Sequence, residues 1–248
     1  MNKKLVAITL AVGALVYASV VTEIFLGYPL SPTRSYLSEL SAIDQASAPL
    51  VRTMDAVAGV LFAAAGFALW MDHRRETGRL AVDAPPAGGL TTEPPAGRWH
   101  SVHVGPLRIV PGRLIAVGLM LAGLATTLDA TFPMDCAESE PGCLERLAMC
   151  TSFSHQAHAV TSSLAGTGLV VVAVGAFFGA RLHQALSTIV VVAMVAQLLA
   201  IGTGLPVGVP QRVQVAASVL LMFVLAWDLW RKGERHVGHS ARPGADTD

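Results

Sequence analysis

The sequence predicts an all-α fold, a polytopic membrane bundle of six transmembrane helices with both termini in the cytoplasm. The chain has 248 residues, of which 53% are hydrophobic and only 14% are charged, so it is more apolar than a typical soluble domain. Its formal net charge is zero and it carries no nucleic-acid-binding motif. We therefore expect the lipid bilayer as its partner, and no nucleic acid.

Six predominantly apolar runs are each about as long as the roughly 20 residues that a transmembrane helix needs. The runs are Leu5–Leu26, Val51–Trp70, Ile109–Leu128, Ala157–Ala180, Thr188–Leu205 and Val213–Trp230. Thirteen of the 17 Lys and Arg residues flank the termini and the connections on the same side as the termini. Because positive residues stay on the cytoplasmic side, the chain is expected to be a multi-pass protein of the inner (plasma) membrane.

The first run has a second interpretation. Lys3 and Lys4, followed by an apolar core and Ala18, also fit a cleaved signal peptide. The run continues to Leu26 and is long enough to cross the bilayer, which favours a span. Cleavage would leave the orientation of the remaining spans unchanged.

The predicted transmembrane domain covers residues 1–232, with a flexible cytoplasmic loop at about 72–108 and a disordered cytoplasmic tail at 233–248. The loop contains the Ala/Pro/Gly-rich segment VDAPPAGGLTTEPPAG, which cannot bury enough apolar surface to order itself. The tail is short and polar.

Two polar segments come early on the outer side. Ser31 followed by Pro32 is typical of a helix start, and the apolar and polar residues of SYLSEL alternate at helical spacing. A short interfacial helix and a capped surface loop both fit this pattern. In the second span, Arg52 and Asp55 are three residues apart, so they are expected either to pair with each other or to face a watery cavity.

The stretch from Leu128 to Ser163 concentrates the polar chemistry and holds all three cysteines. We predict a disulfide between Cys136 and Cys143 on the oxidising side, with Cys150 left over. Zinc binding by all three thiols is disfavoured, because outward-facing thiols are usually oxidised. The next span opens with His155 and His158, which share one helical stripe with Ser162.

Alternating helix direction places six ionisable residues at one depth near the outer surface. They are Glu23, Asp55, Asp129, His155, His158 and Arg212. Charges in hydrocarbon need partners or water, so a shared outer cavity is expected. Three roles fit it: a zinc site, a transport or binding site, and ion pairs that lock the helix ends.

As an enzyme, the protein would be a metal-dependent hydrolase of a lipid-like or envelope substrate. His155, His158 and Asp129 would act as zinc ligands or acid–base groups, with Ser38 and Glu39 hydrogen-bonding the substrate or transition state. Ser35, Arg212 and Asp55 would bind the substrate. The alternatives are a small-molecule transporter or binding protein, and a structural or assembly protein without catalysis.

Several short motifs carry a family resemblance. SYLSEL at Ser35–Leu40, LDATFPMD at Leu128–Asp135, the two histidines and GVPQR at Gly208–Arg212 together resemble the domain-of-unknown-function family 998 of six-span bacterial and archaeal membrane proteins. The resemblance runs from the first span to the sixth, and it implies that the outer polar segments are the characteristic parts.

The sequence is also distantly similar to the membrane hydrolase superfamily that includes alkaline ceramidases, which bind zinc with three histidines. Only two histidines lie in spans on the correct side here. A third ligand would therefore have to be Asp129, Asp135 or Asp55.

Overall fold

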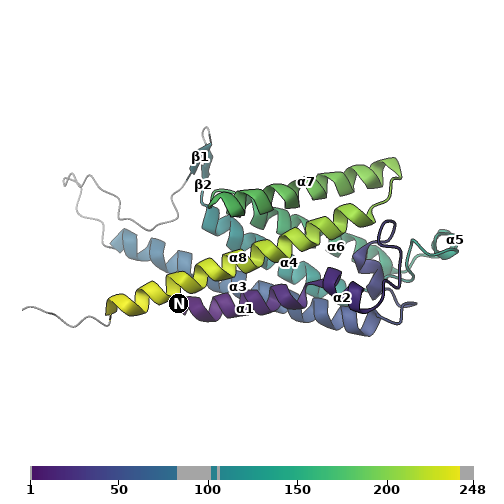
Figure 1. Cartoon of the computed structure of the whole chain (residues 1–248), viewed down its shortest axis with the longest axis horizontal. Helices are drawn as coiled ribbons and strands as arrows, with labels where there is room; N and C mark the ends of the chain where they lie inside the picture. Colours follow the sequence, from purple (N-terminus) through teal and green to yellow (C-terminus); the bar gives the residue numbers. More distant parts are fainter. Residues whose placement is uncertain (1, 83–101, 105–106, 241–248) are drawn as a thin grey trace, which may run out of the picture.

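The architecture is an elongated helical bundle, seen in a computed structural model that describes residues 2–82, 102–104 and 107–240 (Figure 1). These residues form α1 Lys3–Val16, α2 Ser19–Phe25, the 3-10 helix η1 Leu37–Ser41, α3 Ala48–Val82, β1 Val102–Val104, β2 Leu107–Ile109, α4 Pro111–Thr131, α5 Cys143–Met149, α6 Phe153–Ala176, α7 Arg181–Thr203 and α8 Gly208–Ser240. The strands form a small antiparallel hairpin in which His103 pairs with Arg108.

Five helices, α3, α4, α6, α7 and α8, are each long and apolar enough to cross a membrane. Helices α1 and α2 would form a sixth span together, but they are bent by 42° where they meet. The break lies at Ala18, whose ψ of 56° interrupts the helical ladder. The chain is thus a multi-pass membrane protein, and its first apolar run is two short helices where the sequence predicts one.

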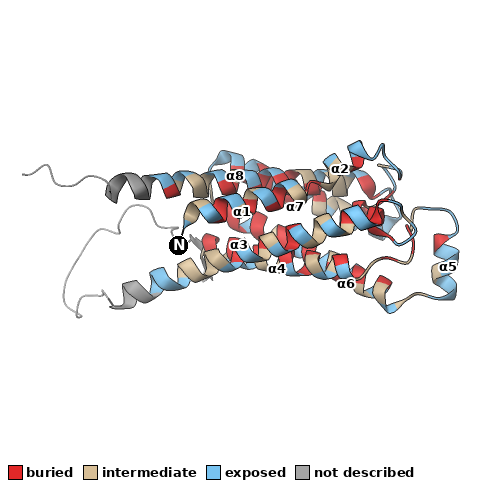
Figure 2. Cartoon of the chain, turned by 90° about the horizontal axis from the view of Figure 1, so that it is seen from below, coloured by how far each residue is buried: buried red, intermediate tan, exposed pale blue. Residues whose placement is uncertain are grey.

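The two ends of the bundle differ. Helix α1 begins and α8 ends at one end, whereas the connections from α2 to α3, from α4 to α6 and from α7 to α8 lie at the other (Figure 1). We call the second end the distal end. Exposed residues run along the outer faces of the helices (Figure 2). Many of them are large and apolar, as lipid-facing residues are.

Helices extend into two segments that the sequence predicts to be unstructured. Helix α3 continues to Val82, and the hairpin occupies part of the predicted loop at 72–108. Helix α8 continues to Ser240, into the predicted tail. The residues just after Trp70 include good helix formers, which explains the longer α3. Residues 83–101, 105–106 and 241–248 lie outside the described residues, and so do the corresponding parts of the predicted loop and the predicted tail.

The predicted outer helix is shorter than expected. Ser31 and Pro32 belong to a turn, and the 3-10 helix begins only at Leu37. Helix η1 lies against the start of α3 and α8. Leu37 and Leu40 are buried there together with Glu39, so the polar and apolar faces both pack into the protein.

Glycines bring α3, α4 and α6 into close contact. A Cβ at Gly123 of α4 would lie 2.3 Å from the backbone nitrogen of Ala63 and 2.4 Å from the carbonyl oxygen of Gly59, both on α3. On the other side, a Cβ at Gly168 of α6 would lie 2.4 Å from the backbone nitrogen of Ala122. Small residues allow such backbone approach in membrane bundles, where packing drives helix association.

Substituting Gly123 by Leu should destabilise the protein by about 3 kcal/mol or more, because rigid backbone occupies the space of the new side chain. Thermal unfolding of the detergent-purified protein measures this. Gly202→Leu is the matched control, since no atom lies within 4 Å of a Cβ there. Equal stability of the two variants would contradict the close packing.

Candidate functional site

An ion pair fastens the distal end. Arg212 of α8 donates from Nε to Oε2 of Glu23 at 2.8 Å, and its Nη2 pairs with the other carboxylate oxygen. Arg212 Nη1 also donates to the carbonyl oxygens of Ser35 at 2.8 Å and of Gly208 at 3.0 Å. Glu23 is completely buried. The pair therefore joins α2, α8 and the connection from α2 to α3, residues 26–47, which we call the first distal loop. Arg212 thus holds these elements together around the site.

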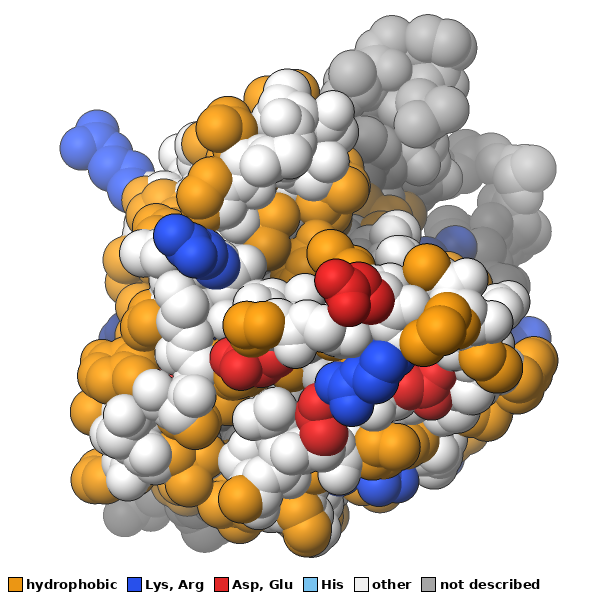
Figure 3. Space-filling model, turned by 90° about the vertical axis from the view of Figure 1, so that its right-hand side faces the viewer, with side chains coloured by type: hydrophobic (Ala, Val, Ile, Leu, Met, Phe, Trp, Pro, Cys, Tyr) orange, Lys and Arg blue, Asp and Glu red, His pale blue; other side chains and the backbone are white. Residues whose placement is uncertain are grey.

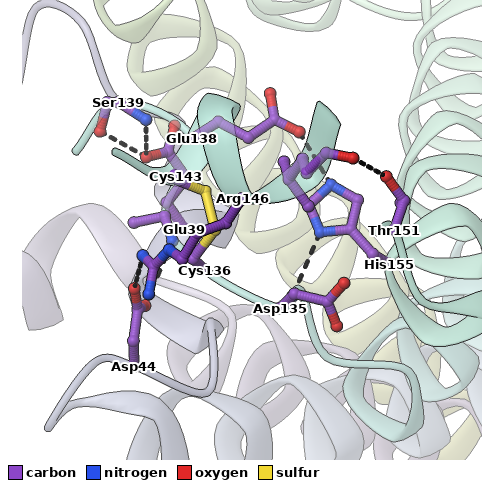
Figure 4. Close-up of a disulfide and its surroundings, with 12 residues drawn as sticks. Glu39, Asp44, Asp135, Cys136, Glu138, Ser139, Cys143, Arg146, Thr151 and His155 are labelled. Carbon is purple, nitrogen blue, oxygen red and sulfur yellow. Dashed lines mark hydrogen bonds and ion pairs between the residues drawn. A yellow bond between two sulfur atoms is a disulfide. The ribbon is translucent and has the colours of Figure 1, made fainter. Parts of the chain in front are cut away.

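Glu39 and Ser35 join the first distal loop to the connection from α4 to α6, residues 132–152, which we call the cysteine loop. Glu39 Oε1 accepts from the backbone nitrogen of Tyr36 at 2.9 Å. Its Oε2 accepts from the backbone nitrogen of Ser139 at 3.0 Å and from the Ser139 hydroxyl (Figure 4). The same hydroxyl lies 2.7 Å from the Ser35 hydroxyl. Burial and the nearby carboxylates of Glu138 and Glu39 raise the pKa of the Tyr36 hydroxyl.

The cysteine loop is closed by a disulfide between Cys136 and Cys143 (Figure 4). Cys150 is free and exposed. Asp44 accepts from the backbone nitrogen of Ala137 at 3.2 Å and pairs with Arg146 at 3.5 Å. The end view shows acidic and basic side chains gathered among apolar ones (Figure 3). The disulfide thus holds a loop that also makes polar contacts with the first distal loop.

Asp135 and Ser152 set the start of α6. The backbone nitrogen and the hydroxyl of Ser152 donate to the Asp135 carboxylate at 2.9 and 2.6 Å. These hydrogen bonds, and the nearby His155, lower the pKa of Asp135. The Ser152 hydroxyl also accepts from the backbone nitrogen of His155 at 3.1 Å and so caps the helix.

His155 is held by the cysteine loop (Figure 4). Its Nδ1 accepts from the backbone nitrogen of Asp135 at 3.1 Å. The proton of the neutral ring is therefore on Nε2, which lies 3.0 Å from Oε1 of Glu138 and donates to it.

His158 is held by α4. Its Nδ1 lies 2.9 Å from the carbonyl oxygen of Phe132 and 3.2 Å from Oδ1 of Asp129. Both neighbours are acceptors, so Nδ1 carries a proton and Nε2 of the neutral ring is an acceptor. Nε2 lies 3.3 Å from the Ser162 hydroxyl. Asp129 Oδ1 also accepts from the hydroxyls of Thr161 at 2.6 Å and Ser162 at 2.8 Å.

The predicted zinc ligands do not form a ligand group. His155 and His158 are hydrogen-bonded to different partners, and only His158 contacts Asp129. Within residues 2–82, 102–104 and 107–240, no three His, Cys, Asp or Glu side chains are arranged to hold a metal ion. The described side chains therefore offer no ready-made set of three ligands, and the zinc site stays a prediction.

A cavity of about 590 Å³ lies beside these residues. The polar part of its wall includes Ser38, Asp55, Asp129, Glu138, His155, His158 and Ser162. The apolar part includes Leu169, Val170, Met194, Leu198 and Ile201. Helices α6 and α7 pack less closely than α4 and α6, and Leu198 and Ile201 line the cavity yet are more than half exposed. The cavity therefore opens sideways between α6 and α7.

Two glutamines face the cavity with unused hydrogen-bonding atoms. Within the part of the chain that the structure describes, buried Oε1 of Gln197 on α7 and buried Nε2 of Gln214 on α8 have no hydrogen-bond partner. Gln211 also lines the cavity, but its Oε1 accepts from the backbone nitrogen of Leu37 at 2.6 Å. An unpartnered buried amide atom in a cavity wall is suited to a ligand.

The structure separates the predicted site residues into two groups. Asp55, Asp129, His155, His158 and Ser38 border the cavity. Glu39, Ser35 and Arg212 are not among the lining residues and make the contacts that hold the distal loops.

Of the two alternatives for Arg52 and Asp55, the described residues show the second for Asp55, which lines the cavity and does not pair with Arg52. Arg52 Nε donates instead to the carbonyl oxygen of Ala130 at 3.0 Å. Sequence reasoning also missed Glu138, Tyr36 and the glutamines as cavity residues. The isolated polar Gln197 in an apolar span was the available signal.

Fold and site define a multi-pass membrane protein with a polar cavity at the end of the bundle opposite its termini. The model of the family described as "Protein of unknown function (DUF998)" matches residues 10–91 and 98–228. The chain belongs to this family, as its short motifs indicate. Comparison with curated proteins and with solved structures gives no match.

Replacing Arg212 by Met should destabilise the protein by about 3 kcal/mol, because Glu23 would be left buried without its charge partner. Thermal unfolding measures the loss, and Arg34→Met, which removes an exposed arginine from the connection between α2 and α3, is the control. Adding Glu23→Gln should restore part of the stability. The role of the pair would be contradicted if Arg212→Met were as stable as the control.

Proposed function

We propose that this protein binds a lipid-like molecule in the distal cavity, on the outer side of the plasma membrane. The supporting observation is the continuity of one cavity from a polar wall of Asp, Glu and His to apolar residues of α6 and α7, of which Leu198 and Ile201 on α7 are exposed. A polar head at the first wall and a hydrocarbon chain at the second would match this division.

The outer placement rests on charge and redox chemistry. Within the described helices, Lys and Arg are more frequent at the end of the bundle where α1 begins and α8 ends than at the distal end. The disulfide lies at the distal end, and disulfides persist in oxidising compartments outside the cytosol. Both observations support cytoplasmic termini and a cavity that faces outward.

Binding is favoured over the other roles considered. The inner part of the cavity is lined by Leu169, Val170 and Met194, which suits a hydrocarbon chain better than a polar solute in transit. Glu23–Arg212 and His155–Glu138 do pair as a locking role requires. Locking alone does not account for a cavity with unpartnered amide atoms.

Gly166→Leu should block chain binding. A Cβ at Gly166 would lie 2.7 Å from the terminal methyl carbon of Met194, across the gap between α6 and α7, so the larger side chain would fill it. The probe is a long-chain alcohol with a diazirine in its chain, crosslinked to the protein in nanodiscs and mapped by mass spectrometry. We expect labelling of α6 and α7 in the cavity and a loss of about tenfold in the variant, equivalent to 1.4 kcal/mol.

The control is Gly202→Leu, which makes the same change on α7 where no atom lies within 4 Å of a Cβ. It should be labelled as strongly as the wild type. Labelling confined to the lipid-facing surface, or unchanged in Gly166→Leu, would refute the proposed binding site.

Acid–base hydrolysis at His158 is a second candidate, favoured by its orientation. Asp129 and the Phe132 carbonyl hold the Nδ1 proton, which leaves Nε2 as a base at the cavity wall. His158 Nε2 would take a proton from water as the oxygen attacks an ester carbonyl, then return it to the departing alcohol. No metal takes part in this step.

With p-nitrophenyl dodecanoate as substrate in nanodiscs, a catalytic His158 predicts that His158→Gln lowers the hydrolysis rate by about 100-fold, typical of loss of a general base. His73→Gln, at the other end of α3, should leave the rate unchanged. If His158→Gln hydrolyses the ester as fast as the wild type, the hydrolase candidate fails while the binding proposal stands.

A further inference from the structure

Asp55 stands apart from the other carboxylates of the cavity. Asp129 accepts hydrogen bonds from two hydroxyls and contacts His158, and Glu138 accepts from His155. Asp55 lines the same cavity on α3, but in the described part of the chain it has no hydrogen bond or ion pair. A carboxylate in a membrane protein normally has a charge partner, a hydrogen-bond donor or water.

The cations near Asp55 are engaged elsewhere. Arg52, one helical turn away, donates to the Ala130 carbonyl, and Arg212 is paired with Glu23. Neither arginine is among the residues that line the cavity, and the lining set contains no lysine. The charged groups of the cavity wall are therefore three carboxylates, Asp55, Asp129 and Glu138, with the two histidines as the only basic groups.

Such a wall discriminates between head groups. An anionic head group, such as a sulfate or phosphate, would meet carboxylates at short range in a medium that screens charge poorly. A protonated amine would place a cation and several N–H donors against them. Gln197, which also lines the cavity, adds an acceptor Oε1 without a partner among the described residues, and this atom suits a donor-rich head group.

We propose that the head group bound in this cavity is a protonated amine and that Asp55 is its counter-ion. The ligand is then a cationic amphiphile, with its ammonium group at Asp55 and its chain between α6 and α7. This inference rests on the proposed lipid-like ligand and names its chemical class. Asp55 is a binding residue on this view, and it completes its own ion pair only when the ligand is present.

The test is competition against the diazirine-bearing alcohol in nanodiscs of zwitterionic phosphatidylcholine. Dodecylamine, dodecanol and dodecyl sulfate share one chain and differ in head group, and an alkylamine is protonated at neutral pH as lysine is. In the wild type, dodecylamine should compete at a concentration about tenfold or more below that of dodecanol, a preference of 1.4 kcal/mol. Dodecyl sulfate should compete least.

Asp55→Asn retains the shape of the side chain and removes its charge. This variant should lose the preference for the amine, which is measured as a fall of about tenfold in the amine-to-alcohol ratio. Comparing the amine-to-alcohol ratio between the two proteins cancels differences in membrane partitioning. Glu145→Gln is the matched control, because this acidic residue lies on α5 outside the cavity and should leave the ratio unchanged.

Two outcomes would overturn the inference: equal competition by amine and alcohol in the wild type, or an amine preference that persists in Asp55→Asn. Either result leaves the crosslink itself intact, so a lipid-like ligand of another class would remain. Failure of the alcohol to crosslink within the cavity is a different result and removes the proposed function together with this inference.

Discussion

The ion pair between Glu23 and Arg212 is the interaction on which the distal end depends. A bilayer offers no water to a buried carboxylate, so the charge of Glu23 has to be matched inside the protein. Arg212 does this and uses its remaining donor capacity on the carbonyl oxygens of Ser35 and Gly208. One guanidinium thus fixes the entry to α8 and the loop before η1, and these elements form one side of the cavity.

The same requirement explains the rest of the site. Several ionisable groups near the distal end have partners in another element: Glu39 is bonded to Ser139, His155 to Glu138, and Asp129 to Thr161 and Ser162. These contacts tie the loops together without filling the space between α6, α7 and α8. Asp55 and the amide atoms of Gln197 and Gln214 are what this network leaves available for a ligand.

The membrane class and five of the spans could be predicted from the sequence, because hydropathy and length act locally along the chain. The bend between α1 and α2 could not, since neither Pro nor Gly marks Ala18. Alternating spans also brought Asp55, Asp129, His155 and His158 to one cavity, as their common depth suggested. The contacts between neighbouring helices and loops could not be predicted, because they join residues far apart in the sequence. Arg52 contacts Ala130, and Glu39 contacts a serine a hundred residues away.

The most direct test of the central claim is an electron cryo-microscopy map of the protein in nanodiscs made from the lipids of its own membrane. A lipid-like ligand predicts elongated density with one end beside Asp55 and His158 and the other between α6 and α7, near Leu198. A map in which α6 and α7 close against each other, with Asp55 paired to a protein cation, would contradict it.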